Sequence, residues 1–277
     1  GALPKDSLHD HLMGVYLSGA DRIKIRFPSG EERIFRKQIR RFLRNTRGFE
    51  IMDESESELE LICLISAAEM PLSASINRMY LQLSSLVRDI ISVLQGDDIE
   101  LLSDAEERES EVDALLYLVD RQVCIALDSH LVATSLKIGR NQAVEHTNLA
   151  QSLERMMDHA LQMAVLTRLY PKVRLKSSEP PVIQIPMWQK AIKQLMINIR
   201  TRDSHEIEEA RLSLKQAQNE ISQFEETLLA NRKLSEEELF FFRISESVRR
   251  LCAYARDFGE VLLLSLIHIS EPTRLGM

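Results

Sequence analysis

Two pairs of acidic residues, each with a spacing of four, are the side chains in this sequence best suited to chemistry. The first pair is Glu109 and Asp113, and the second is Glu154 and Asp158. Residues i and i+4 share one face of a helix, so each pair would present two carboxylates together. Both pairs lie within about 40° of the apolar stripe of their predicted helix, whereas exposed carboxylates normally take the opposite side.

The lengths of the predicted helices place the two pairs at one level. Asp113 lies 15 residues before a break near Asp128, and Glu154 lies 13 residues after Asn141. In an antiparallel hairpin, arms of similar length bring the pairs to nearly equal height. Converging carboxylates would repel one another and lose hydration, and a bound cation is the usual remedy. The spacing therefore indicates a metal site; solvated faces or partners of Lys and Arg are the alternative.

Other residues that could take part in chemistry give weaker signals. His146 and His159 could complete a metal site, although an ordinary packing or surface position is the preferred interpretation of both, and Asp120 is a weaker candidate than either. No glycine-rich phosphate loop, HExxH or GxSxG motif is present, so we predict no catalytic residues. A metal-dependent hydrolase stays open as an alternative only if the clustered carboxylates activate water on a metal.

Seven basic residues crowd one short predicted helix near the start of the chain. Arg36, Lys37, Arg40 and Arg44 are candidates for contact with DNA phosphates or with an acidic partner. The alternative is a solvated face lying over buried aromatic and aliphatic residues. The net charge of −7 provides no sequence-wide basic field for holding nucleic acid.

The composition favours helices as the elements that carry these residues. Aromatic residues make up 5% of the 277 residues, and there are only 9 Gly and 8 Pro. The three cysteines form no CxxC pair, so neither a zinc ribbon nor a disulfide framework is predicted. The longest apolar run, residues 261–269, is too short to cross a membrane.

Residues 1–68 are predicted to form a small α+β domain. A helix over residues 7–17, a strand over residues 22–27 and a basic helix that stops near Gly48 precede a hairpin of residues 49–53 and 59–64.

From Ser75 onward the apolar residues repeat every three or four positions, which predicts two sets of three helices. The first bundle spans residues 74–171 and the second spans residues 182–264, with a proline-containing linker between them. Ser103 with Glu106, and Ser235 with Glu238, have the spacing of capping boxes that open helices. The predicted fold is therefore mainly α, with two tandem three-helix bundles behind a small α+β domain.

The segment Ser152-Leu153-Glu154-Arg155-Met156-Met157-Asp158-His159-Ala160 resembles the L-E-R-I-x-D-H-A signature of PhoU proteins, which regulate phosphate uptake. Glu109 to Asp113 resembles the preceding E/D-x-x-x-D motif of that family. Residues 48–54 and 77–80 are similar to segments of archaeal PhoU-like proteins that carry an upstream SpoVT/AbrB-type domain. That domain is largely absent here, and the first residue is Gly, so the resemblance indicates an N-terminal truncation.

The resemblance implies an iron or zinc cluster on Glu109, Asp113, Glu154 and Asp158 in the first bundle. It also implies cytoplasmic regulation of phosphate uptake by contact with a phosphate transporter or its sensor kinase, in a homodimer without a membrane span. DNA contact, and with it transcriptional regulation as an alternative function, would come only through the missing upstream domain.

The second bundle departs from the family pattern. Residues 247–255 align with the signature, but Arg249 replaces its Glu and Ala253 replaces its Asp. The partner motif around Gln218 and Ser222 has also lost its acids, so no metal is predicted there. Residues 265–277 resemble a translated sequencing-adapter string and are predicted to be a non-native tail.

Overall fold

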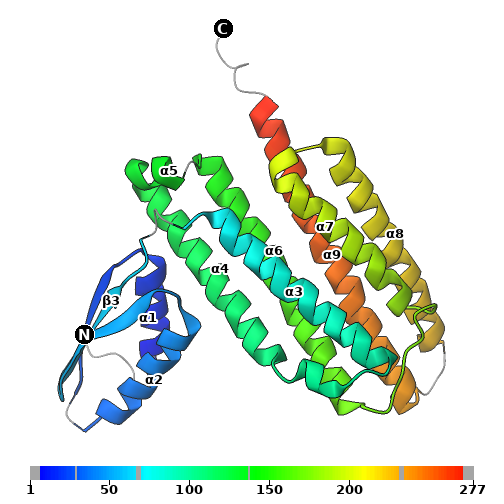
Figure 1. Ribbon diagram of the computed structural model, residues 1–277, viewed down its shortest axis with the longest axis horizontal. Coiled ribbons are helices and arrows are strands. Elements are labelled where there is room, and N and C mark those ends of the chain that lie inside the picture. The colour runs from blue at the N-terminus through cyan, green and yellow to red at the C-terminus, as the bar shows by residue number, and fades with distance from the viewer. Residues whose placement is uncertain (1–6, 29, 67–69, 137, 231–233, 271–277) are drawn as a thin grey trace. The chain divides into compact units, whose positions relative to one another are not determined.

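A computed structural model of the chain describes residues 7–28, 30–66, 70–136, 138–230 and 234–270 (Figure 1). Its contacts divide the chain into two compact units. The first unit comprises Gly1–Ile76 with Asp113–Thr147, and the second comprises Asn77–Val112 with Asn148–Met277. No helix among the described residues is both long enough and apolar enough to cross a membrane.

The first unit contains the small α+β fold expected from the sequence. Its elements, in chain order, are α1 (Leu8–Leu17), β1 (Arg22–Arg26), α2 (Glu32–Asn45), β2 (Phe49–Glu54) and β3 (Glu58–Cys63). The three strands form an antiparallel sheet in the order β1-β3-β2, with a bulge in β2 between Ile51 and Asp53. The predicted helices, strand and hairpin are all present, each within a few residues of its predicted bounds.

The core of this fold lies between the two helices and one face of the sheet. Alternation along β1 buries Ile23 and Ile25 and exposes the charged residues between them. Three residues of α2 face this core, and aromatic rings of α1, α2 and β2 contact one another in it. The buried members of the core are Leu8, Leu12, Tyr16, Ile23, Ile25, Phe27, Phe35, Ile39, Phe42, Phe49, Leu59 and Leu61.

A buried arginine of α4 (Ala105–Asp128) joins this fold to the C-terminal part of that helix. Arg121 is 2% exposed, donates to the carbonyl of Tyr16 at 2.6 Å and pairs with Asp21 at 2.8 Å. Its guanidinium also lies over the rings of Tyr16 and Phe49. Gly19 permits the close approach, because a Cβ at this position, with φ of +89°, would lie 2.6 Å from Ile125 Cγ1.

The helices of the first predicted bundle are present, with one addition. The predicted long helices are α3 (Leu72–Gln95), α4 and α6 (Arg140–Leu169), and the 3₁₀ turn η1 (Ile99–Leu102) lies between α3 and α4. The sequence predicted only a polar break between α4 and α6, whereas the structure has the short helix α5 (His130–Leu136) there. That prediction was wrong because α5 buries none of its residues, so no apolar stripe marks it.

One of the two predicted capping boxes forms and the other does not. The backbone N–H of Ser235 donates to Glu238, and that of Glu238 donates to the Ser235 hydroxyl, as predicted. The Ser103 hydroxyl instead donates to the carbonyl of Glu100, because Ser103 closes the η1 turn. Glu106 pairs with Arg168, so the predicted box of Ser103 and Glu106 was wrong.

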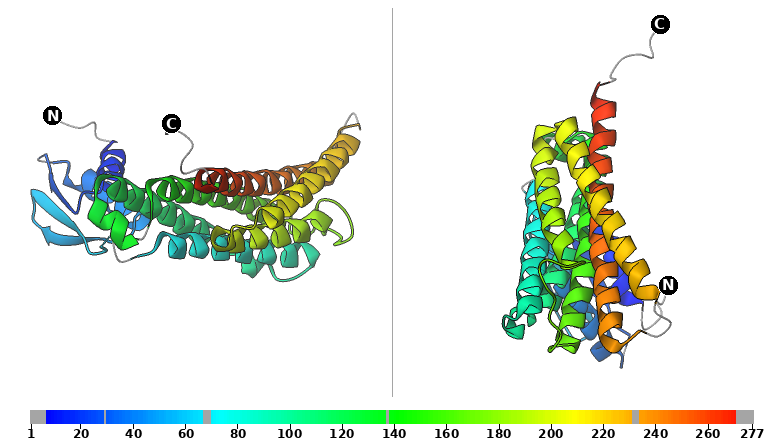
Figure 2. Two further views of the ribbon diagram at one scale, coloured as in Figure 1. Left: turned by 90° about the horizontal axis from the view of Figure 1, so that it is seen from above. Right: turned by 90° about the vertical axis from the view of Figure 1, so that its right-hand side faces the viewer.

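The second predicted bundle consists of α7 (Ile185–Thr201), α8 (Ser204–Leu229) and α9 (Glu236–Ser270), with the short turn η2 (Val182–Gln184) before it. All three helices contact one another, and Figure 2 shows α8 and α9 side by side. Asp203 caps α8 by accepting from the N–H groups of His205 and Glu206. The described residues between Ser75 and Leu264 contain no strand, as the helical periodicity predicted. α9 continues beyond Leu264, where the predicted tail begins, and residues 271–277 lie outside the described part.

We expect Asp21→Asn to lower the free energy of unfolding by about 1–3 kcal/mol, because Arg121 would stay buried without its counter-charge. The loss should stay below that of a fully buried ion pair, since the Asp21 side chain is 78% exposed. Urea denaturation measures the difference. Asp10→Asn, which alters an exposed carboxylate on α1, is the control. Equal denaturation midpoints for Asp21→Asn and the unaltered protein would contradict this role of the ion pair.

Candidate functional site

The carboxylates of the two predicted pairs lie on α4 and α6, as the sequence indicated, and all four residues are half-buried. Glu109, Glu154 and Asp158 belong to the second compact unit, whereas Asp113 belongs to the first. Convergence of all four therefore stays a prediction. The three residues of the second unit form the part of the site described below.

Glu109 and Asp158 lie near enough for their charges to interact. Burial raises the pKa of the Glu109 carboxyl, and the neighbouring Asp158 carboxylate raises it further. Burial also raises the pKa of Asp158, against a smaller opposite effect from His159. Neither carboxylate makes an ion pair with a described residue, and Glu109 accepts only a 3.4 Å hydrogen bond from Ser110. The two acids thus form a partly desolvated pair with unbalanced negative charge.

A pair of carboxylates supplies the oxygen ligands that hard cations prefer, although such cations take at least six ligands. Among the described residues, no three His, Cys, Asp or Glu side chains gather closely enough to hold a metal ion. The chemistry of Glu109 and Asp158 therefore fits one cation that keeps water in its shell. The iron or zinc cluster on all four carboxylates stays a prediction.

The histidines considered as extra ligands both make other contacts. His159 stacks on Tyr254 of α9 with ring centroids 5.8 Å apart, and burial lowers the pKa of its imidazole. His146 is buried, and its Nδ1 donates to the carbonyl of Gln142 at 2.6 Å. Asp120 lies near Thr147, and burial raises the pKa of its carboxyl. These contacts give each of the three side chains a place in the packing of its unit.

The second bundle has an ion pair at the position aligned with the signature. Arg249 donates through Nε to both oxygens of Glu225, at 2.9 and 3.2 Å, and the Ser245 hydroxyl lies 3.3 Å from Glu225. Glu225 is 8% exposed, so this carboxylate is buried against a cationic partner. The sequence comparison of the two motifs missed Glu225, because it lies about one helical turn beyond Ser222 and two turns beyond Gln218, and it has no counterpart in the motif.

The basic helix α2 uses one of its candidate residues for local structure. Arg36 pairs with Glu54, donates to the carbonyl of Ser55 at 2.8 Å and lies over the ring of Phe27. Lys37, Arg40 and Arg44 are exposed and make no ion pair with any described residue. Arg33 shares their face of α2, opposite the buried face, so these four residues form an exposed basic stripe.

We expect Asp158→Asn to lower the pKa of Glu109, because it removes the like charge beside that carboxyl. A raised carboxyl pKa costs stability only where the group is ionised, so the cost is absent below the unfolded pKa and complete above the folded pKa. The substitution should therefore leave stability unchanged at acid pH. At neutral pH it should raise stability by less than about 1 kcal/mol, since both groups are partly solvated.

A pH titration of the Glu109 carboxyl carbon by NMR measures this shift in the two proteins. Glu107→Gln, an exposed acid on another face of α4, is the matched control and should leave the titration unchanged. An unaltered Glu109 titration in Asp158→Asn would show that the two charges do not interact.

Comparison with known proteins supports the resemblance found in the sequence. A family model described as the PhoU domain matches residues 76–167, which cover most of α3, all of α4 and most of α6. No curated protein sequence matches the chain. Among solved structures, the crystal structure of PhoU from Pseudomonas aeruginosa aligns over 71% of this chain and 96% of its own, with 13% identity and a TM-score of 0.46.

Both motifs that carry the resemblance, residues 109–113 and residues 152–160, fall inside the matched segment. The half-buried Glu109 and Asp158 belong to it as well. The match to the PhoU-domain model therefore supports the resemblance to the PhoU-type family over residues 76–167.

Proposed function

We propose that this chain is a regulator of phosphate uptake and phosphate homeostasis that acts through contact with other proteins. The observation that supports the proposal is the match of the PhoU-domain model to residues 76–167, a segment in which the charges of Glu109 and Asp158 interact. The expected partners are components of a phosphate transporter or its sensor kinase, which the chain would bind in the cytoplasm. A homodimer is the expected form of the protein.

The partly desolvated carboxylate pair supports a role for a bound cation in this function. Two acids that share unbalanced charge gain stability when a cation neutralises them, and iron or zinc is the candidate implied by the family. The cation would tie α4 to α6 in the second unit. In the second bundle the Arg249 guanidinium and Glu225 already neutralise each other, so a metal has no comparable role there.

The first experiment measures phosphate uptake in cells that lack the gene and carry it back on a plasmid. We expect the unaltered chain to restore regulation of uptake by external phosphate. Glu109→Gln with Asp158→Asn should fail to restore it, whereas Glu107→Gln should restore it fully. Regulation restored equally by both variants would exclude a role for the carboxylate pair, and failure of the unaltered chain would contradict the proposed function itself.

Metal content tests the cation separately. Protein purified without chelator should contain iron or zinc, and Glu154→Gln or Asp158→Asn should reduce that content severalfold, since each removes a carboxylate ligand. Elemental analysis gives the result, and Glu107→Gln is again the matched control. Metal content that is equal in all four proteins would exclude these residues as ligands. Turnover of a phosphate ester by the metal-loaded protein would instead favour the metal-dependent hydrolase.

The exposed basic stripe of α2 supports a second candidate function, contact with DNA or an acidic partner in transcriptional regulation. Charge reversal of Lys37, Arg40 and Arg44 should abolish retention on DNA, and the affinity of the unaltered chain should fall steeply with salt. Arg36 is left in place because it pairs with Glu54. Retention is measured on immobilised duplex DNA at several salt concentrations. If the unaltered chain is not retained even at low salt, the stripe does not bind DNA in this chain.

A further inference from the structure

A second apolar stripe runs along α6, on a side of the helix that does not face its core. The buried residues of this part of α6 include Met156, Met157, Ala160, Met163 and Ala164. The second stripe consists of Leu161, Val165, Leu166 and Leu169, which are half-buried or exposed. Leu169 is 67% exposed, so the stripe reaches the surface at this end of α6.

This stripe lines one side of an open groove between α6 and α9. Ring contacts join the two helices at both ends of the groove: His159 with Tyr254 at 5.8 Å, and Tyr170 with Phe240 at 5.3 Å. Between these contacts lies a cavity of about 490 Å³. The twelve residues from His159 to Tyr170 span about 16 Å along the helix direction. The groove therefore has the volume of a small-molecule site and an elongated form.

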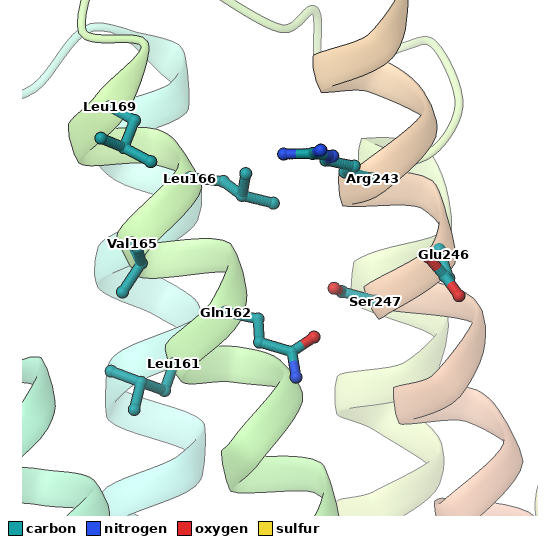
Figure 3. A pocket seen from close by; sticks show the side chains of 8 residues that line it. All are labelled: Leu161, Gln162, Val165, Leu166, Leu169, Arg243, Glu246 and Ser247. Carbon is teal, nitrogen blue, oxygen red and sulfur yellow. The ribbon is translucent and has the colours of Figure 1, made fainter.

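The side of the groove formed by α9 is polar. It comprises Arg243, Glu246 and Ser247, and Gln162 adds an amide from α6. Figure 3 shows the Arg243 guanidinium directed toward Leu166, the Ser247 hydroxyl directed toward Gln162, and the Glu246 side chain turned away from α6. Arg243 makes no hydrogen bond or ion pair with any residue that the structure describes. The groove thus offers one cation directed toward the apolar wall, whereas the acidic side chain of its lining, Glu246, is turned away from α6.

We propose that this groove binds an amphipathic organic anion, a chain-shaped carboxylate whose head group pairs with Arg243 and whose apolar chain lies along the stripe of α6. An apolar wall beside a single arginine matches a ligand with one anionic end and one apolar end. A cation would be repelled by Arg243, and a sugar would leave the leucines exposed to water. This binding is separate from the proposed regulation of phosphate uptake and does not depend on it.

Calorimetric titration of the full chain with decanoate, below the concentration at which it forms micelles, tests the proposal. Decanoate should bind with one site per chain, and octanoate should bind up to about tenfold more weakly, because two methylene groups less are buried. Decanol, which has the same chain without the charge, should bind more weakly than decanoate. Absence of decanoate binding in the millimolar range would overturn the proposal.

Two variants assign the binding to this groove. Arg243→Gln should weaken decanoate about five- to tenfold and leave decanol unchanged, since only the charged head group loses its partner. Arg200→Gln, which removes an exposed arginine of α7, is the matched control and should change neither affinity. Equal losses in the two arginine variants would show that the groove does not recognise the head group.

Leu166→Trp fills the groove from α6 and should abolish binding of both ligands, while the helical circular dichroism spectrum stays unchanged. Binding that survives Leu166→Trp would place the site elsewhere and overturn the proposal. Sedimentation of the same variant distinguishes a protein occupant. If the unaltered chain self-associates through the groove and Leu166→Trp does not, and neither binds decanoate, then the groove is an interface between copies of the chain.

Discussion

The first compact unit depends on one buried guanidinium. Arg121 is the cation through which α4 meets the small α+β fold, and it satisfies a backbone carbonyl, a carboxylate and two aromatic faces together. A buried charge is costly unless such partners surround it, so Tyr16, Asp21 and Phe49 must all be in place for Arg121 to stay buried. The close approach of Gly19 to Ile125 meets the same requirement, because it brings the end of α1 against α4. The position of α4 against the small α+β fold is thus set by electrostatic interactions as well as by apolar packing.

The two bundles balance charge at their aligned motif positions in different ways. In the segment that the PhoU-domain model matches, Glu109 and Asp158 are both acidic, and burial together with their mutual repulsion raises the pKa of Glu109. In the second bundle, Arg249 stands where the signature has its glutamate, and the buried Glu225 supplies the opposite charge from α8. The charges of the second arrangement are therefore balanced within the chain.

Sequence patterns predicted the features that depend on residues close together in the sequence. They failed where the partner of a side chain lies far away in the sequence. The reciprocal bonds of Ser235 and Glu238 need only four consecutive residues, so that capping box was predictable. Glu106 has the same spacing from Ser103, but Arg168 of α6 takes its carboxylate. In the sequence Arg36 resembles any surface arginine of a basic helix, but in the structure it pairs with Glu54 of the hairpin. Arg121 and Glu225 were likewise missed, because burial and pairing between elements far apart in sequence leave no periodic mark.

The carboxylate site and the groove show a further limit of predictions from helical periodicity. One helix can pack against two different neighbours, and the sequence does not show which residues face which neighbour. On α6 the buried stripe was visible in the sequence because its residues recur at the helical period. Leu161, Val165 and Leu169 also recur, at intervals of four, but the sequence alone does not distinguish them from the residues of the core stripe. Only the position of α9, fixed by the ring contacts at His159 and Tyr170, separates the two faces. The helix that carries Asp158 toward Glu109 of α4 therefore also carries an apolar wall toward Arg243, so the metal hypothesis and the ligand hypothesis concern two faces of one element.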